Sequence, residues 1–307
     1  MGLLKKGEKA PKEEKVKKAK KTKKAKKAKK VMEPQYYTSA TGMPTYNYKV
    51  YYLKPLEKVI CFLIAFCVGA AVGYLFYGGL AKDEFGDPTK MTWFLNITIS
   101  GIAGLICGIA FLPIRRNQII EKQRKTLNHQ FRDMLEGLTT SLNAGKNVAD
   151  SFHAVYDDLK VQYDEGAYIL QELEIVLSGM ANNVDIEDLL ADFGVRSGID
   201  DISSFANVFK ICYRKGGNIK ETIRTTHEIL SDKMEISEEI ETIVTGSKSE
   251  QTIMVFMPIA LIGVIKLMSP EFAANFTTPS GVASTTVAIG LFVAAYFIGK
   301  VVLDIKV

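Results

Sequence analysis

The side chains with the greatest capacity for chemistry in this sequence are three histidines, four cysteines and several acidic pairs. His129, His153 and His227 stand far apart, and none has a second histidine or a cysteine at the spacing that zinc ligands adopt. The cysteines form no CxxC pair, so they are typical of small apolar residues. They are Cys61, Cys67, Cys107 and Cys212. We therefore expect no metal, no cofactor and no disulfide.

Two glycine–lysine stretches invite comparison with phosphate-binding loops. Residues 145–147 (Gly-Lys-Asn) lack the upstream glycine and the Ser or Thr of a P-loop, and residues 246–249 (Gly-Ser-Lys-Ser) fail for the same reason. Adjacent carboxylates such as Asp157 and Asp158 project from different sides of a helix, so nothing selects an acid–base pair. The sequence therefore predicts a protein that is not an enzyme.

Four apolar segments bracket the rest of the chain and decide its class. Each is close to the roughly 20 apolar residues that a helix needs to cross a membrane. They are Val59–Leu80, Trp93–Ile114, Thr252–Met268 and Val282–Leu303. The stretch between the second and third segments, residues 115–251, has a soluble composition. We therefore expect an integral membrane protein whose central domain lies at one membrane face.

The distribution of cations predicts the orientation. Lys54 and Lys58 precede the first segment, and five cations follow the second within residues 115–125. Lys and Arg near span ends favour the cytoplasm, so both termini and the central domain should lie on the cytoplasmic side of the cell membrane. The segments carry no carboxylate or arginine, which disfavours a transporter. Lys266 lies near the expected outer end of the third segment, where its ammonium can extend to the interface.

The first 50 residues read as a disordered polybasic tail. Residues 1–30 contain 15 Lys and 3 Glu, a net charge of +12 in a chain of net charge +5. Attraction to anionic lipids is worth about 1 kcal/mol per cation. Residues 1–30 contain no aromatic residue on which bases could stack, which disfavours nucleic acid, and we do not expect it as a partner. Residues 36–52 are rich in tyrosine, a residue enriched at the membrane interface, so the last of these tyrosines should mark where the chain meets the headgroups.

The central domain has the pattern of an all-helical unit. Apolar residues recur at helical spacing in six stretches between Leu127 and Met234, and glycines and asparagine caps separate these stretches. The sequence thus predicts an all-α fold with four transmembrane helices, two plus two, bracketing a cytoplasmic six-helix antiparallel bundle. The expected divisions are 1–50 (tail), 51–114 (first hairpin), 115–250 (bundle) and 251–307 (second hairpin). No breaker separates the bundle's first and last helices from the second and third spans.

Glycines in the first two apolar segments recur at spacings of three and four. Such spacing indicates close packing of helices, within one protomer or between protomers. These residues are Gly69, Gly73, Gly101, Gly104 and Gly108.

The arrangement resembles the F-domain family of inner-membrane platform proteins from type II secretion and type IV pilus machines. The nearest branch is that of the tight-adherence (Tad) pilus proteins TadB and TadC, since the longer relatives carry two such domains. The resemblance extends from Phe131 to Pro258, and the polybasic tail has no counterpart in it. The motif residues that carry it, expected to be structural, are Gly145, Gly179, Phe193, Arg196, Gly216, Gly217, Asn218 and Pro258.

The resemblance implies a non-catalytic role in coupling a cytoplasmic secretion ATPase to the extraction of pilin subunits from the membrane. The implied partners are that ATPase, prepilin or pilin subunits and a paralogous platform protein. We expect an oligomer packed through the glycine-rich spans, with the polybasic tail on anionic lipids. Acidic residues of the bundle are the candidate ATPase-binding surface: Asp157, Asp158, Glu165, Glu172, Glu187 and Asp188. The alternative is a membrane-anchored scaffold or sensor, unrelated to pili, whose tail binds lipid.

Overall fold

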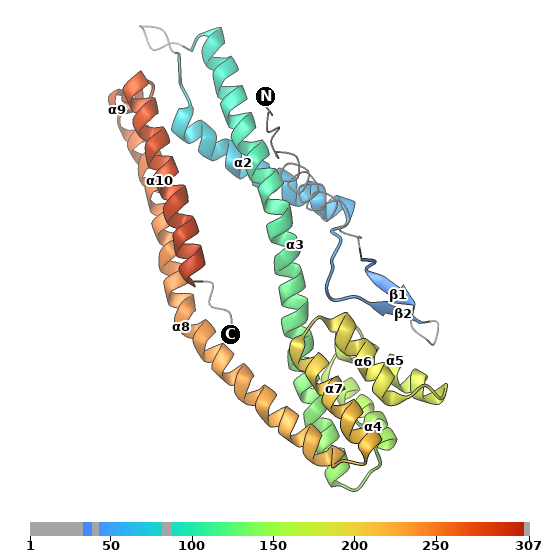
Figure 1. Ribbon diagram of the computed structural model, residues 1–307. Coiled ribbons are helices and arrows are strands. Elements are labelled where there is room, and N and C mark those ends of the chain that lie inside the picture. Colours follow the sequence, from blue (N-terminus) through green and yellow to red (C-terminus); the bar gives the residue numbers. More distant parts are fainter. Residues whose placement is uncertain (1–32, 39–42, 82–87, 304–307) are drawn as a thin grey trace, which may run out of the picture.

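The computed structural model describes residues 33–38, 43–81 and 88–303, and nearly all of them lie in helices (Figure 1). The helices are α2 (Pro55–Tyr77), α3 (Lys90–Asn143), α4 (Val148–Gln162), α5 (Tyr168–Ala181), α6 (Ile186–Ser197), α7 (Asp200–Lys215), α8 (Ile219–Met268), α9 (Pro270–Asn275) and α10 (Pro279–Leu303). Two short strands, β1 (Tyr36–Thr38) and β2 (Pro44–Tyr46), pair antiparallel. The predicted all-α class is confirmed apart from this hairpin.

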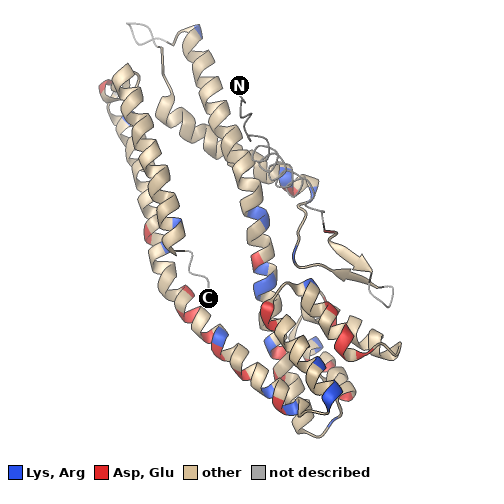
Figure 2. Ribbon diagram, in the orientation of Figure 1, with Lys and Arg blue, Asp and Glu red and all other residues tan. Residues whose placement is uncertain are grey.

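Helices α2, α3, α8 and α10 are long and apolar enough to cross a membrane. Charged residues are sparse in their apolar parts and gather on the lower half of α3 and α8 and on α4 to α7 (Figure 2). The predicted segments fall inside these helices, except that α2 ends at Tyr77 rather than Leu80. Gly79 has a φ of +93°, a left-handed conformation that a helix cannot continue through.

Helices α3 and α8 extend from their apolar parts directly into the helical domain (Figure 1). They contain 54 and 50 residues, or about 81 Å and 75 Å at a rise of 1.5 Å per residue. Pro113 and Pro258 lie inside these helices without ending them. The predicted absence of a break between membrane segment and domain is confirmed on both sides.

A single hydrophobic core holds the helical domain together. It is built from α3 beyond Leu127, from α4 to α7 and from the first part of α8. Phe131 contacts the rings of Phe193 and Phe205 edge-on, with centroid distances of 6.1 and 5.5 Å. Aromatic pairs in this geometry contribute about 0.5–1.5 kcal/mol each beyond the burial of their area.

The turns between these helices use the predicted glycines and caps. Gly145, Gly198 and Gly216 have φ values of +88°, +63° and +72°. An L side chain rarely adopts this conformation, so glycine is favoured at each position. Asn147 and Asn218 accept a hydrogen bond from the backbone N–H three residues on, at 2.8 and 3.2 Å. The local sequence therefore sets where α4 and α8 begin.

Four glycines are buried where α2 crosses α3. They are Gly69, Gly73, Gly104 and Gly108. A Cβ at Gly69 would lie 2.7 Å from the Cβ of Cys107, and one at Gly104 would lie 2.8 Å from the ring of Phe66. The close packing of these four glycines is therefore between two helices of one chain. Gly101 alone of the predicted set has open space around it.

Residues 43–50, which we call the docking segment, pack against the helical domain. Tyr48 is fully buried, and its ring lies edge-on to Tyr168 at 5.6 Å. The predicted tail extended to residue 50, and its last tyrosines were expected at the membrane interface. Tyr48 does not lie in a free tail, because its hydroxyl finds a partner inside the domain. Residues 1–32 and 39–42 lie outside the described residues, so the lysine-rich tail stays a prediction.

Candidate functional site

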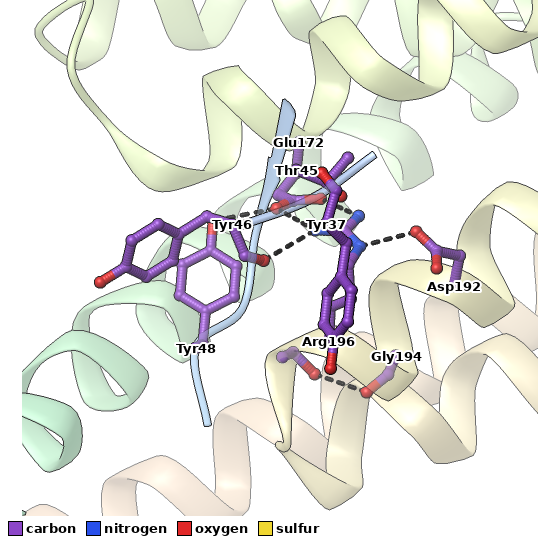
Figure 3. A network of polar contacts seen from close by, with 9 residues as sticks. Tyr37, Thr45, Tyr46, Tyr48, Glu172, Asp192, Gly194 and Arg196 are labelled. Atoms are coloured by element: carbon purple, nitrogen blue, oxygen red, sulfur yellow. Dashed lines mark hydrogen bonds and ion pairs between the residues drawn. The ribbon is translucent and has the colours of Figure 1, made fainter. Parts of the chain in front are cut away.

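A buried polar cluster joins the docking segment to α5 and α6 (Figure 3). Arg196 on α6 donates to both carboxylate oxygens of Glu172 on α5, at 2.8 and 2.7 Å. The Tyr48 hydroxyl donates to Glu172 Oε1 at 3.0 Å. Glu172 and Arg196 expose only 2% and 3% of their surface. Such a pair is tolerated in a core because geometry and additional hydrogen bonds offset the cost of desolvation.

The same arginine fixes the backbone of the docking segment. Its Nη1 donates to the carbonyl oxygen of Tyr46 at 3.1 Å, and its Nε donates to Asp192 at 2.6 Å. The backbone N–H of Tyr48 donates to the carbonyl of Arg196 at 3.1 Å. From α3, Arg124 Nε donates to the carbonyl of Tyr48 at 3.3 Å. The docking segment is thereby bound to three helices just before the chain enters α2.

The pKa shifts in this cluster keep its two donor side chains, Tyr48 and Arg196, protonated. Burial raises the pKa of Glu172, and the hydrogen bonds and charge of Arg196 oppose that shift. Burial alone would lower the pKa of Arg196, but its contacts with Glu172 and Asp192 together outweigh burial, so the pKa is raised. Burial and the nearby Glu172 raise the pKa of Tyr48. Arg196 and Tyr48 therefore keep their protons at neutral pH, and the cluster can position the docking segment but is poorly suited to proton transfer.

Two of the six residues predicted for an acidic binding surface are buried in the domain. Glu172 is the partner of Arg196 described above. Glu187 on α6 is 5% exposed, and Arg214 Nε on α7 donates to it at 2.9 Å. The prediction that these two carboxylates face a partner protein is wrong, because each neutralises an arginine within the fold.

The remaining four predicted residues are exposed. Asp188 forms an ion pair with Lys210 at 2.8 Å. Asp157, Asp158 and Glu165 form no ion pair with any residue that the structure describes. We call these three carboxylates, on α4 and the α4–α5 connection, the acidic face. Their charge is available to a cationic partner.

Several motif residues have structural positions in the fold. A Cβ at Gly179 would lie 2.5 Å from the methyl groups of Leu189, so this glycine permits α5 and α6 to approach. Phe193 is 2% exposed and lies in the core. Gly217 connects α7 to α8. Pro258 lines an apolar cavity of about 530 Å³ between α2, α8 and α10.

Ion pairs between α3 and α8 were not predicted from the sequence. Lys125 on α3 binds Glu241 on α8, and His129 lies 3.9 Å from Glu238. All four residues line a cavity of about 400 Å³ where the two helices leave the domain. The only sequence signal for these contacts is the glutamate-rich stretch of residues 238–241 (Glu-Glu-Ile-Glu). These contacts connect α3 and α8 at the point where both helices leave the helical domain.

In the part of the chain that the structure describes, no group of three or more His, Cys, Asp or Glu is arranged to hold a metal ion. Comparison of the chain with protein-family models, with curated proteins and with solved structures finds no match.

Proposed function

We propose that this protein is a non-catalytic platform in the cytoplasmic membrane of a type II secretion or Tad-like type IV pilus machine. The observation that carries the proposal is the continuity of α3 and α8, each of which extends unbroken from an apolar part into the helical domain. A domain attached in this way can transmit a movement made outside the membrane to the helices within it.

The contacts of the docking segment extend this coupling to a third apolar helix. Residues 43–50 are bound through Tyr48, Glu172 and Arg196, and the chain enters α2 at Pro55. A displacement of the helical domain therefore acts on α2, α3 and α8 together, and α10 follows α8 through the short connection that contains α9. This is the mechanical property that a platform between an ATPase and a membrane-embedded subunit requires.

In the proposed machine, the helical domain is the antiparallel six-helix bundle on the cytoplasmic side. The acidic face receives a basic surface of the secretion ATPase, and prepilin or pilin subunits contact the apolar helices. A paralogous platform protein or further copies complete the assembly, and the polybasic tail lies on anionic lipids. Complementary charge speeds encounter with the ATPase, and like charges brought face to face oppose binding, so reversal of these charges should prevent the contact.

Charge reversal tests the role of the acidic face. The double variant Asp157→Lys and Asp158→Lys should abolish co-purification of the ATPase and pilus assembly while leaving the protein in the membrane. The matched control is Asp232→Lys with Glu235→Lys, which changes the net charge equally on an exposed part of α8. Intact pilus assembly in the first variant, or equal loss in both, would refute the assignment of this face.

The proposed class is tested separately from the proposed face. Copurification of a secretion ATPase with the unaltered protein supports the platform role whatever the charge variants do. Recovery of only lipid and unrelated receptors would instead favour a membrane scaffold or sensor that uses the polybasic tail.

A further inference from the structure

A cavity of about 910 Å³ lies between α2, α3 and α8, near the end of α3 that is remote from the helical domain. Most of its lining is apolar and includes Ala70, Leu75, Ile97 and Leu267. Its volume falls in the upper part of the range of small-molecule sites, about 300–1,000 Å³. The site takes no part in the contacts that support the proposed function.

One face of α3 turns polar groups toward this cavity. Thr92, Asn96 and Ser100 follow one another at intervals of four residues, and all three line it. Thr92 is satisfied, because its hydroxyl donates to the carbonyl of Ala81. Asn96 Oδ1 accepts from the backbone N–H of Gly79 at 3.0 Å, which leaves the Asn96 amide hydrogens without a partner among the described residues.

Ser100 is the most informative of these residues. Its Oγ is buried and has no hydrogen-bond partner among the described residues. Thr98, two residues away and outside the cavity, satisfies its hydroxyl by donating to the carbonyl of Phe94 at 2.7 Å. Ser100 has an equivalent carbonyl on the same helix but does not bind it. A buried hydroxyl without a partner costs about 1–3 kcal/mol, so a ligand that accepts its hydrogen bond is favoured.

Lys266 on α8 provides a third donor at the cavity. Its Nζ donates to the carbonyl of Leu75 at 2.6 Å and lies 4.6 Å from the centre of the Phe276 ring. The side chain thus turns toward the C-terminal end of α2. Besides the Asn96 amide, the Ser100 hydroxyl and the Lys266 ammonium, the lining includes the Tyr74 hydroxyl and the Trp93 indole N–H. Each of these groups can donate a hydrogen bond, so a ligand with an apolar body and an accepting group complements the cavity.

We propose that this cavity binds one acidic phospholipid. The phosphate accepts from Asn96 and lies in the field of Lys266, and the ester carbonyl accepts from Ser100 one helical turn deeper, while an acyl chain lies along the apolar wall. A membrane-spanning partner helix is a poorer fit, because its backbone carbonyls are already hydrogen-bonded within the helix and cannot accept from these donors. The ligand is therefore a lipid of the bilayer that fixes the distance between the α2–α3 and α8–α10 hairpins.

Native mass spectrometry of the full chain, reconstituted in phosphatidylglycerol and released in mild detergent, tests this proposal. The unaltered protein should retain one phospholipid. Ser100→Ala should weaken retention about fivefold, since one hydrogen bond to the neutral ester carbonyl is lost. The control Thr98→Ala removes a hydroxyl from the same helix and should retain the lipid, and Ser100→Thr should restore it.

A second comparison examines the lysine. Lys266→Gln should abolish the preference for phosphatidylglycerol over phosphatidylcholine, and the thermal unfolding midpoints of all variants establish that they are folded. Equal retention by Ser100→Ala and Thr98→Ala would overturn the proposal. Retention of a copurified protein in place of lipid, abolished by the same Ser100 substitution, would also overturn it and make the cavity a helix-binding site.

Discussion

Removal of the Arg196 guanidinium should loosen the docking segment and weaken the helical domain. In an Arg196→Met variant, Glu172 stays 2% exposed but loses both charge-assisted hydrogen bonds at 2.8 and 2.7 Å. A buried charge that loses its partner costs about 3–5 kcal/mol, against a total stability of about 5–15 kcal/mol for a typical domain. Tyr48→Phe removes only one hydrogen bond to this carboxylate and should cost about 1–2 kcal/mol.

A double variant distinguishes the loss of the whole ion pair from the loss of one charge. The double variant Glu172→Met with Arg196→Met removes both charges, and it should be more stable than Arg196→Met alone. Arg224 forms a surface pair with Glu221, and Arg224→Met should have little effect because both side chains are about half exposed. Equilibrium unfolding of the full chain in detergent gives the free energies.

Hydrogen exchange reports on the docking segment itself. Amides of residues 43–50 should exchange faster in Arg196→Met and in Tyr48→Phe, because local opening no longer breaks the full set of contacts. Backbone amides of α3 around Phe131 should exchange faster only by the amount that the lower global stability explains. Unchanged exchange at 43–50 together with a loss below about 1 kcal/mol in Arg196→Met would refute the reasoning about a buried, coupling ion pair.

Three further predictions concern the packing and charge of the helical domain. Gly179→Val should destabilise it by about 1–3 kcal/mol in denaturant unfolding, because even a Cβ would lie 2.5 Å from Leu189; unaltered stability would mean that α5 and α6 are less closely packed. Gly246→Ala should stabilise by about 0.5–1 kcal/mol, since this glycine is inside α8 with open space around it, and a loss of stability would argue against a continuous α8. The Arg214 hydrogen bond lowers the pKa of Glu187 below its ordinary 4.5, so the stability from this pair is present above that value and is lost as pH falls through the lowered pKa. Glu187→Gln should therefore flatten the acid dependence of the unfolding midpoint, and parallel pH profiles would contradict the assignment.

The long helices and their ends could be predicted from the sequence because their signals are local. Apolar length identifies the membrane helices, and Gly216 followed by Asn218 marks the end of α7 and the start of α8. The sequence shows no helix-ending signal between the second span and residue 127 or just before residue 252, and this predicted that α3 and α8 are continuous.

The candidate site was harder to predict because its contacts join distant parts of the chain. Tyr48 and Glu172 are 124 residues apart, and tyrosine composition alone does not distinguish a membrane interface from a buried site with a polar partner. One signal was present in the sequence: Glu172 lies three residues after Ile169 and four before Val176, on the apolar face of α5. A carboxylate at that position indicates burial with a cation, and only the fold shows that the cation is Arg196.

Crosslinking of the tagged, full-length protein in its own membranes, followed by identification of its partners, tests the platform role most directly. The account predicts a secretion ATPase linked to the helical domain, together with a second platform protein or a prepilin linked to the apolar helices. Recovery of ribosomal proteins or unrelated receptors, with neither an ATPase nor a prepilin, would contradict it.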